Sequence, residues 1–373
     1  MTRNDSRIRD LFDWPLFICI VLISVLGVIN LYSATSVYTG NRAELYISQI
    51  YWLFLGGIVG GVLIAVDYRH LERAAYPLYT FGVFTLALVF VLARDVRGSA
   101  RWIEFGSFRF QPSEFTKVFL VIALAKYLHD DPRNEGRSLR ELLVPAALTA
   151  VPGLLILKQP DLGTASIHFI VFLLIAALTK VRWQSVAVFV GTVSAVAPIV
   201  WTYVLLPYQR QRVTTFLNPE ADILKGGWHA HHSRVAIGNG ELLGLGYLKG
   251  TQNQFNFLPD QYTDFPFPVF AEEWGFAGCM VLIALYMFLC VWGIRVASQA
   301  RDRFGCVLAV GCSSILFCHA VINIGMTSGV LPVVGVTLPL FSYGGSSVLT
   351  MLTCASLIIN VSMRRYSSVA DRL

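Results

Sequence analysis

The stretch PLFICIVLISVLGVINLYS, residues 15–33, contains no charged side chain. A run of about 20 mainly apolar residues is long enough to cross the hydrocarbon core of a bilayer as a helix. The run follows a basic N-terminus, MTRNDSRIRD, that lacks a small-residue cleavage site. We therefore expect it to be a membrane anchor and not a removed signal peptide.

Comparable apolar segments recur along the 373 residues, of which 55% are apolar and 14% charged. This composition is far from that of soluble domains and predicts an all-α polytopic membrane protein. The fourth and fifth segments are short and the last begins in a Gly/Ser-rich stretch, so eight or nine spans with re-entrant pieces are an alternative. We expect ten transmembrane helices in a single domain, residues 1–373, at about 15–33, 48–66, 76–92, 114–128, 142–157, 162–179, 185–205, 267–294, 305–325 and 345–363.

The distribution of Lys and Arg predicts the orientation in the membrane. With ten spans, the loops on the side of the two termini hold more of these residues than the opposite side, whose charges are concentrated in two long loops. The positive-inside rule then places both termini in the cytoplasm. Topology accounts for the net charge of +6, so no nucleic-acid partner is required. All seven cysteines fall in apolar segments without a CxxC pair, which argues against a disulfide framework and a zinc site.

The connections expected outside the membrane hold the unusual chemistry of the chain. One of them, the large extracytoplasmic loop at about 206–265, is too long for a simple connection and is expected to be ordered over the membrane surface or to act on a substrate. Its three histidines, His229, His231 and His232, match no known metal spacing and are interpreted as solvated loop residues. The activity is therefore expected to face outward.

Asp264, in LPDQYTDFPFP (258–268), is the leading candidate for a catalytic residue. It stands at the start of an apolar span, and Glu272 and Glu273 follow two turns later, so a polar stripe is expected to enter the helix. An alternative is that Asp264 caps this helix, because Pro266 falls near the first turn.

A second pair of ionisable residues lies inside a span, where charge is costly and usually functional. Glu114 and Lys117 are three residues apart on one helical face and can pair. The alternative is a carboxylate favoured by the helix N-terminus, with Lys117 reaching the membrane surface.

Polar residues near the expected outer boundary complete the candidates. Arg101 and Trp102 precede the fourth span, and Trp102 alone is typical of an interfacial anchor. Lys158 and Asp161 lie where a Pro and a Gly break two spans, and Asp161 also suits a helix cap. Ser342 belongs to a Pro/Gly-rich segment, 329–347, that is predicted to line a polar cleft.

Taken together, the stretches RFQPSE, KQPDLGT, IGNGELLGLGYLKGTQ, FLPDQYTDF, AEEWGF, NIGM, SGVLPVVGV and LPLFSYGGSS resemble the SEDS family (shape, elongation, division and sporulation). Val333 and Val334, where the division type tends to carry Thr-Lys, and the frame FLPDQ...AEEWG favour its elongation type over the division and sporulation types. The resemblance implies a ten-helix peptidoglycan glycosyltransferase of the cytoplasmic (inner) membrane. Such an enzyme polymerises lipid II on the extracytoplasmic side and works with a class B penicillin-binding protein, a transpeptidase, within the elongation machinery and among membrane lipids.

The resemblance also implies roles for residues. Asp264 matches the essential loop aspartate of the family, Glu114 with Lys117 its cavity ion pair, and Arg101, Trp102 and Asp161 its RW and QPD elements. Tyr262 and His232 depart from a usual histidine and glutamine, and Pro266 and Pro268 replace usual aliphatic or small residues, which puts the helix start after Asp264 in doubt.

The chemistry of the substrate suggests a mechanism. Lipid II has an α-linked diphosphate and the product is β-1,4-linked, so a single inverting displacement suffices, with Asp264 as base and a pKa raised by its apolar surroundings. The departing diphosphate needs positive charge, for which the candidates are Lys117, Arg101, Arg109 and Arg210. A divalent cation, Mg²⁺ or Mn²⁺, is left open.

Two other classes of function fit part of the sequence. A lipid II flippase or transporter would also have many spans, broken helices and an intramembrane ion pair. A purely structural scaffold for a partner synthase would leave the pair of Glu114 and Lys117 without a task, and neutral replacement of both would be harmless.

Overall fold

The computed structural model describes residues 12–92, 101–105, 108–131, 137–179, 181–205, 207–217, 227–258 and 260–365. Most of these residues are helical and very few are in strands, which confirms the predicted all-α class. The two strands among the described residues, β1 (Ile103–Phe105) and β2 (Phe108–Phe110), form an antiparallel hairpin.

Each of the ten apolar segments of the sequence forms a helix. Seven helices among the described residues are long and apolar enough to cross a membrane. Helices α7 and α8 are shorter, and α6 carries the charged residues Glu114 and Lys117. Ten transmembrane spans therefore stay a prediction. A π turn, η2 (Val200–Val204), continues α9. The helices are α2 (Trp14–Thr35), α3 (Leu45–Ala65), α5 (Ala75–Leu92), α6 (Pro112–Asp130), α7 (Leu143–Lys158), α8 (Leu162–Leu178), α9 (Trp183–Ile199), α13 (Pro266–Ser298), α14 (Arg303–Thr327) and α15 (Gly345–Arg364).

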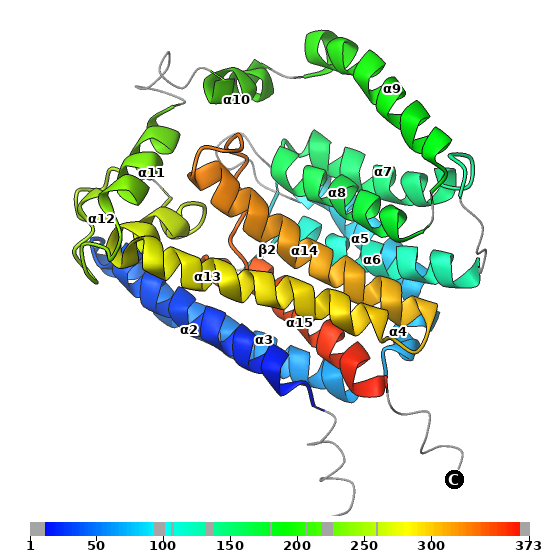
Figure 1. Ribbon diagram of the computed structural model, residues 1–373, viewed down its shortest axis with the longest axis horizontal. Coiled ribbons are helices and arrows are strands. Elements are labelled where there is room, and N and C mark those ends of the chain that lie inside the picture. Colours follow the sequence, from blue (N-terminus) through cyan, green and yellow to red (C-terminus); the bar gives the residue numbers. More distant parts are fainter. Residues whose placement is uncertain are drawn as a thin grey trace, which may run out of the picture.

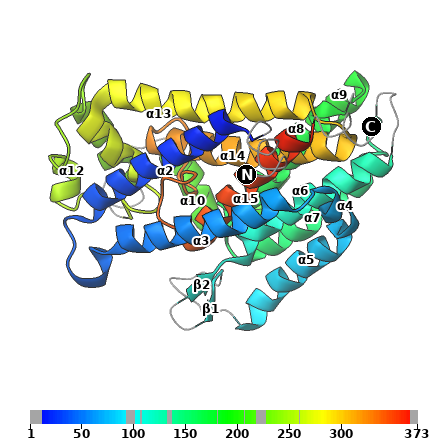
Figure 2. The same cartoon turned by 90° about the horizontal axis from the view of Figure 1, so that it is seen from below.

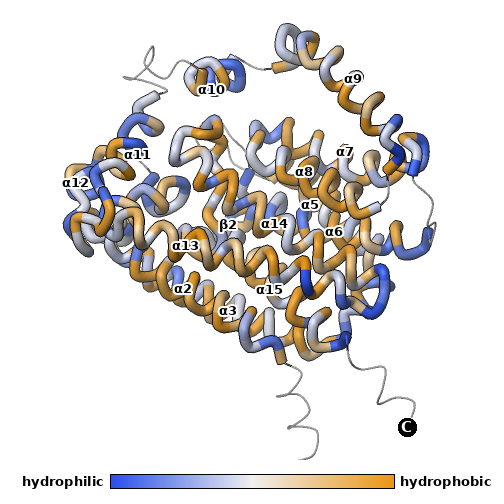
Figure 3. Tube along the Cα trace, viewed as in Figure 1, coloured by the Kyte–Doolittle hydropathy of each residue, from blue (hydrophilic) through white to orange (hydrophobic). Residues whose placement is uncertain are grey.

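Helices α14 and α15 form the centre of the bundle. Of the residues in their apolar stretches, 83% in α14 and 72% in α15 are buried inside the protein, against 17% in α3. Figures 1 and 2 show α2, α3 and α13 on one side of them and α6 to α8 on the other. The helices are apolar along their lengths and more hydrophilic near their ends (Figure 3), as expected for a bundle whose outer surface faces lipid.

Small residues allow α3 to approach α15 closely. A Cβ on Gly56 would lie 2.4 Å from Leu352 Cδ1, and one on Gly60 would lie 2.4 Å from Ser356 Oγ. The glycine pattern of α3 thus serves packing within the chain.

The expected extracytoplasmic loop at about 206–265 is ordered in its described parts. It contains α10 (Pro207–Leu217), α11 (Trp228–Asn239) and α12 (Thr251–Gln254). Helices α11 and α12 lie at the end of the bundle where α13 begins, and the start of α2 and the end of α15 lie at the opposite end (Figure 1). Two shorter pieces, η1 (Gly40–Arg42) and α4 (Arg69–Arg73), connect neighbouring helices.

A kink in α13 provides backbone hydrogen bonds to the segment of residues 240–250, between α11 and α12, which we call the outer segment. Gly275 has a φ of 65°, a conformation that favours glycine, and it interrupts the helical dihedrals of α13. The carbonyl of Glu272 therefore accepts from the N–H of Leu245 (2.9 Å), and the N–H of Phe276 donates to the carbonyl of Glu241 (2.9 Å). The outer segment is thus joined to α13 by backbone hydrogen bonds.

Candidate functional site

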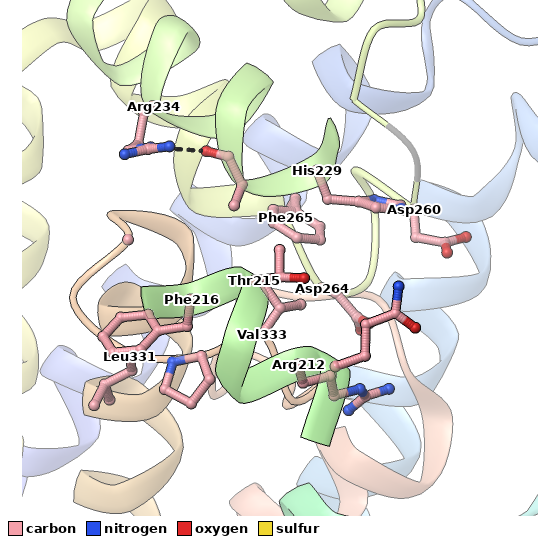
Figure 4. Close-up of a pocket in the computed structure, with 15 residues that line it drawn as sticks. Arg212, Thr215, Phe216, His229, Arg234, Asp260, Asp264, Phe265, Leu331 and Val333 are labelled. Atoms are coloured by element: carbon pink, nitrogen blue, oxygen red, sulfur yellow. Dashed lines mark hydrogen bonds between the residues drawn. The ribbon is translucent and has the colours of Figure 1, made fainter. Parts of the chain in front are cut away.

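A cavity of about 400 Å³ lies where α10, α11, the turn before α13 and the segment after α14 meet (Figure 4). Its wall combines acidic, basic and apolar side chains with the backbone of the Pro/Gly-rich segment. The lining residues are Gln211, Arg212, Thr215, Phe216, His229, Ala230, Arg234, Asp260, Asp264, Phe265, Gly329, Leu331, Pro332, Val333 and Gly335.

Asp264 lines this cavity from a turn and does not cap a helix. Helix α13 begins at Pro266, and the residue before it, Phe265, makes no side-chain cap, so the capping alternative is wrong. The N–H of Asp264 donates to the carbonyl of Asp260 (3.0 Å), which forms the turn. The carboxylate is therefore free of a helix-capping role and faces the cavity.

The surroundings of Asp264 raise its pKa to about 6, mainly because burial disfavours the charged form and, secondarily, because the Asp260 carboxylate is close. A hydrogen bond with Thr263 and the charges of Arg101 and Arg212 lower the pKa and offset part of this effect. The sequence-based expectation of a raised pKa is in line with this environment. A group of this kind changes protonation near the pH at which a general base works best.

Two arginines and a histidine also line the cavity. Arg212 comes from α10, and Arg234 from α11, where its Nε donates to the carbonyl of Ala230 (3.3 Å). His229 stacks on Phe265, with ring centroids 5.7 Å apart. Burial lowers the pKa of His229, so it is neutral near pH 7. The lining of the cavity therefore combines two arginines with two carboxylates.

The interpretation of the three histidines as solvated loop residues is wrong. His229, His231 and His232 lie on helix α11 and are partly buried. His232 stacks on Phe257, with centroids 5.2 Å apart, and hydrogen-bonds with Gln252 (2.8 Å). Phe265 and Phe257, which follow α11 in the chain, thus cover the rings of His229 and His232, and sequence spacing does not reveal these contacts.

Glu114 and Lys117 form a buried ion pair on α6. Lys117 Nζ lies 2.9 Å from Glu114 Oε1 and 2.6 Å from His319 Nε2 on α14, and the Lys117 side chain is 1% exposed. His319 Nδ1 lies 3.0 Å from the carbonyl of Thr337, so Nδ1 donates there and Nε2 accepts from Lys117. The alternative in which Lys117 reaches the membrane surface is wrong, and the pair lies outside the lining of the Asp264 cavity.

Arg101 and Asp161 are brought together as a second polar cluster. Asp161 caps α8 by accepting from the N–H of Thr164 (3.1 Å), and it also accepts from Gln111 Nε2 (3.3 Å). Arg101 lies 3.8 Å from the Asp161 carboxylate and donates to the carbonyl of Gln159 (3.1 Å). The interpretation of Asp161 as a helix cap is therefore confirmed, and its role in the site stays a prediction. Trp102, which follows Arg101 in the chain, is half-buried.

Two predicted site residues serve local structure away from the cavity. Glu272 is fully buried and accepts from the N–H groups of Thr251 (3.1 Å) and Gln252 (3.2 Å) at the start of α12. Ser342 accepts from the N–H of Leu338 (2.8 Å) inside the Pro/Gly-rich segment. The polar stripe expected from Asp264 to Glu272 is wrong, because the two carboxylates face different elements.

Three predicted cationic residues also lie outside the cavity lining. Arg109 pairs with Glu104 (3.1 Å) across the exposed hairpin, and Lys158 is at the end of α7. Arg210 donates to the carbonyls of Leu205 (3.0 Å) and Thr202 (2.8 Å). Arg212, two residues later on α10, takes the place that the sequence assigned to Arg210.

Comparison with known proteins identifies the family. Residues 13–367 match the family of FtsW, RodA and SpoVE, described as cell cycle proteins. The chain belongs to the SEDS family. Among SEDS relatives, the peptidoglycan glycosyltransferase MrdB of Escherichia coli K12 is 36% identical, over 92% of this chain and 93% of its own. The peptidoglycan glycosyltransferase RodA of Treponema pallidum is 30% identical, over 96% and 100%.

Solved SEDS structures have the same fold. A chain of a peptidoglycan synthase complex, described for its coordination of polymerization and crosslinking, has a TM-score of 0.82 and 34% identity, covering 95% of this chain and 98% of that one. The rod-shape-determining protein RodA of Thermus thermophilus has a TM-score of 0.70 and 29% identity, with the same coverage. The rod-shape name agrees with the predicted elongation type. The apolar helices and these relatives also show that the protein is a multi-pass protein of the inner membrane.

The described residues of this SEDS protein bring together no group of three or more His, Cys, Asp or Glu side chains suited to a metal ion. Mg²⁺, however, often takes only one or two carboxylates from a protein and its remaining ligands from substrate phosphates and water. The expected divalent cation therefore stays a prediction.

Sequence reasoning missed Arg212, Arg234 and Asp260 as members of the site. Arg210 and Arg212 are two residues apart and therefore face different sides of a helix, and only the direction of α10 decides between them. Asp260 was visible in the same quoted stretch as Asp264. The sequence does not show that Asp260 has a positive φ of 48° and lies in a turn that places it on the cavity wall.

Proposed function

We propose that this protein is an elongation-type peptidoglycan glycosyltransferase that polymerises lipid II into β-1,4 glycan strands, with Asp264 as the general base. The observation that carries the proposal is a half-buried carboxylate with a pKa of about 6 in a cavity that also holds Arg212 and Arg234. The names of the relatives, peptidoglycan glycosyltransferases, support the reaction class.

The reaction is one inverting displacement. The 4-hydroxyl of the acceptor sugar attacks C1 of the donor, its proton passes to the Asp264 carboxylate, and the bond from C1 to the diphosphate oxygen breaks. Undecaprenyl diphosphate leaves with the electron pair, and Arg212 and Arg234 stabilise its charge. The transition state is oxocarbenium-like, as in inverting glycosidases.

Other parts of the proposal concern partners and surroundings. A class B penicillin-binding protein would crosslink the strands, as the likeness to a chain of a synthase complex supports. Mg²⁺ or Mn²⁺ arriving with the diphosphate would neutralise part of the phosphate charge. The cavity would face the extracytoplasmic side, and both termini the cytoplasm.

The Asp264→Asn variant tests the proposal. It keeps the shape of the side chain but cannot accept the proton, so we expect the rate of lipid II polymerisation to fall by about 10²–10⁴-fold. The variant is expected to fold, because it removes a charge that burial disfavours. Glu241→Gln, an exposed carboxylate in the same outer segment, is the matched control and should keep the parental rate. An Asp264→Asn protein that polymerises at the parental rate would remove Asp264 from this role.

The assay also separates the enzyme from a flippase. Purified protein in detergent has no compartments between which lipid II can move, so polymer formed there requires catalysis. The assay is run with and without the cognate penicillin-binding protein and with a chelator, which tests the partner and the metal. Absence of polymer under all of these conditions would favour the transporter.

A further inference from the structure

A buried amide on α14 links two irregular segments beside the cavity. Asn323 is fully buried, and its Nδ2 donates to the carbonyl of Asp264 (2.9 Å) and to the carbonyl of Val336 (2.6 Å). Asp264 belongs to the turn before α13, and Val336 to the Pro/Gly-rich segment after α14. Both N–H groups of one amide are therefore used to hold these two backbones together.

The backbone beside this amide fits against the Asp264 carboxylate. Gly335 precedes Val336, has a φ of 72°, and a Cβ on it would lie 3.2 Å from Asp264 Oδ2. His319, one turn earlier on α14, holds the carbonyl of the next residue, Thr337 (3.0 Å). Two successive carbonyls are thus fixed to α14, but only Asn323 extends this attachment to Asp264.

We propose that Asn323 is a positioning residue that sets the direction of the Asp264 carboxylate by fixing the backbone of Asp264 to that of Val336. The inference rests on the proposed role of Asp264 as base. Asn323 does not line the cavity, so its influence on the reaction passes through Asp264. The amide is suited to the task because a single Nδ2 atom carries two donors.

The loss of this amide has a definite physical consequence. In Asn323→Leu a side chain of similar size fills the space, but both carbonyls lose their donor. The turn that carries Asp264 is then free to shift toward solvent, and a shift of about 1 Å in a catalytic group lowers the rate by about 10²-fold. Greater exposure of the carboxylate also weakens the burial that raises its pKa.

The chain offers a matched control in Asn360 on α15. Its Nδ2 likewise donates to two backbone carbonyls, those of Leu63 and Val66, and the residue is 1% exposed. These carbonyls lie at the end of α3, far along the chain from the cavity residues. Asn360→Leu therefore removes the same kind of hydrogen bonds without touching the cavity.

The measurement is the pH–rate profile of lipid II polymerisation for the full chain. The charged and titratable groups that act on Asp264 or line its cavity are Asp260 in its own turn, Arg212 on α10, His229 and Arg234 on α11, and Arg101 before β1. The acid limb of this profile is the range in which the rate falls with decreasing pH because the base gains a proton. We expect Asn323→Leu to lose about 10²-fold in rate and to shift its acid limb to lower pH. Asn360→Leu should keep the acid limb of the parent. An unshifted acid limb in Asn323→Leu, with or without a loss of rate, would overturn the inference.

A second variant covers poor folding of the first. Asn323→Ser is smaller and keeps one hydroxyl donor, so we expect a smaller shift of the acid limb in the same direction. An unshifted limb here also counts against the inference. If Asp264→Asn keeps its activity, the proposed function fails. If Asp264→Asn is inactive but the Asn323 variants have the parental acid limb, only the positioning role fails.

Discussion

The pKa of Asp264 predicts a pH dependence. Its folded-state pKa of about 6 is above the usual value for Asp, so the carboxylate gains a proton as the pH falls through about 6 and can no longer act as base. The polymerisation rate should therefore decrease about tenfold for each pH unit below that value and level off above it. Initial rates at constant ionic strength check this. A rate that stays flat well below pH 6 would contradict the assignment of Asp264 as base.

The buried pair on α6 predicts a difference between single and double replacements. Lys117→Met leaves the Glu114 carboxylate buried without its cation, which costs about 3–5 kcal/mol, whereas Glu114→Gln together with Lys117→Met leaves no buried charge. The single variant should therefore unfold at a clearly lower temperature than the double variant. Thermal unfolding in detergent measures both. Equal unfolding temperatures would contradict the ion pair, and full activity in the double variant would support the scaffold alternative.

At the scale of elements, the contact between α8 and the Pro/Gly-rich segment predicts the effect of one methyl group. A Cβ on Gly163 would lie 2.8 Å from the carbonyl oxygen of Val334 and 2.9 Å from Val336 Cγ2. Gly163→Ala therefore overpacks the contact, at a cost of about 1–3 kcal/mol, and displaces the backbone next to Asp264. We expect lower stability and a lower polymerisation rate, measured by thermal unfolding and the lipid II assay.

A glycine in open space is the control for this prediction. Gly61 on α3 has no atom within 4 Å of the position of a Cβ. Because alanine is favoured over glycine in a helix interior by about 0.5–1 kcal/mol, Gly61→Ala should keep or raise the unfolding temperature. Equal effects of the two substitutions would show that the contact of α8 is not tight.

The helices could largely be predicted from the sequence because apolar length alone determines them. Each expected apolar segment is a helix, and α13 begins at Pro266, one residue before the expected start. Helix α10 is different, because its residues are mostly polar and its sequence, PYQRQRVTTFL, has no apolar stripe that announces it. The side chains that α10 contributes, Arg212 above all, were therefore missed with it.

Over the whole molecule, the cavity was only partly predictable. Asp264 could be identified because a carboxylate at the start of an apolar span is unusual, and the pairing of Glu114 with Lys117 followed from helical spacing. The partner of Asp264 on α14, Asn323, is 59 residues away in sequence, and no local pattern reports that contact. Contacts between distant segments depend on how the helices pack, which periodicity does not encode.

The orientation of the whole protein is a prediction from charge that thiol labelling can check. The native cysteines in the described residues are buried or half-buried, so they react little with a membrane-impermeant reagent. Leu243, which is 76% exposed beyond α11, and Ser298, exposed at the far end of α13, lie at opposite ends of the bundle. If both termini are cytoplasmic, Leu243→Cys should react in intact spheroplasts, and Ser298→Cys only after the membrane is permeabilised. The reverse pattern would place the Asp264 cavity on the cytoplasmic side, where it could not build an external glycan strand.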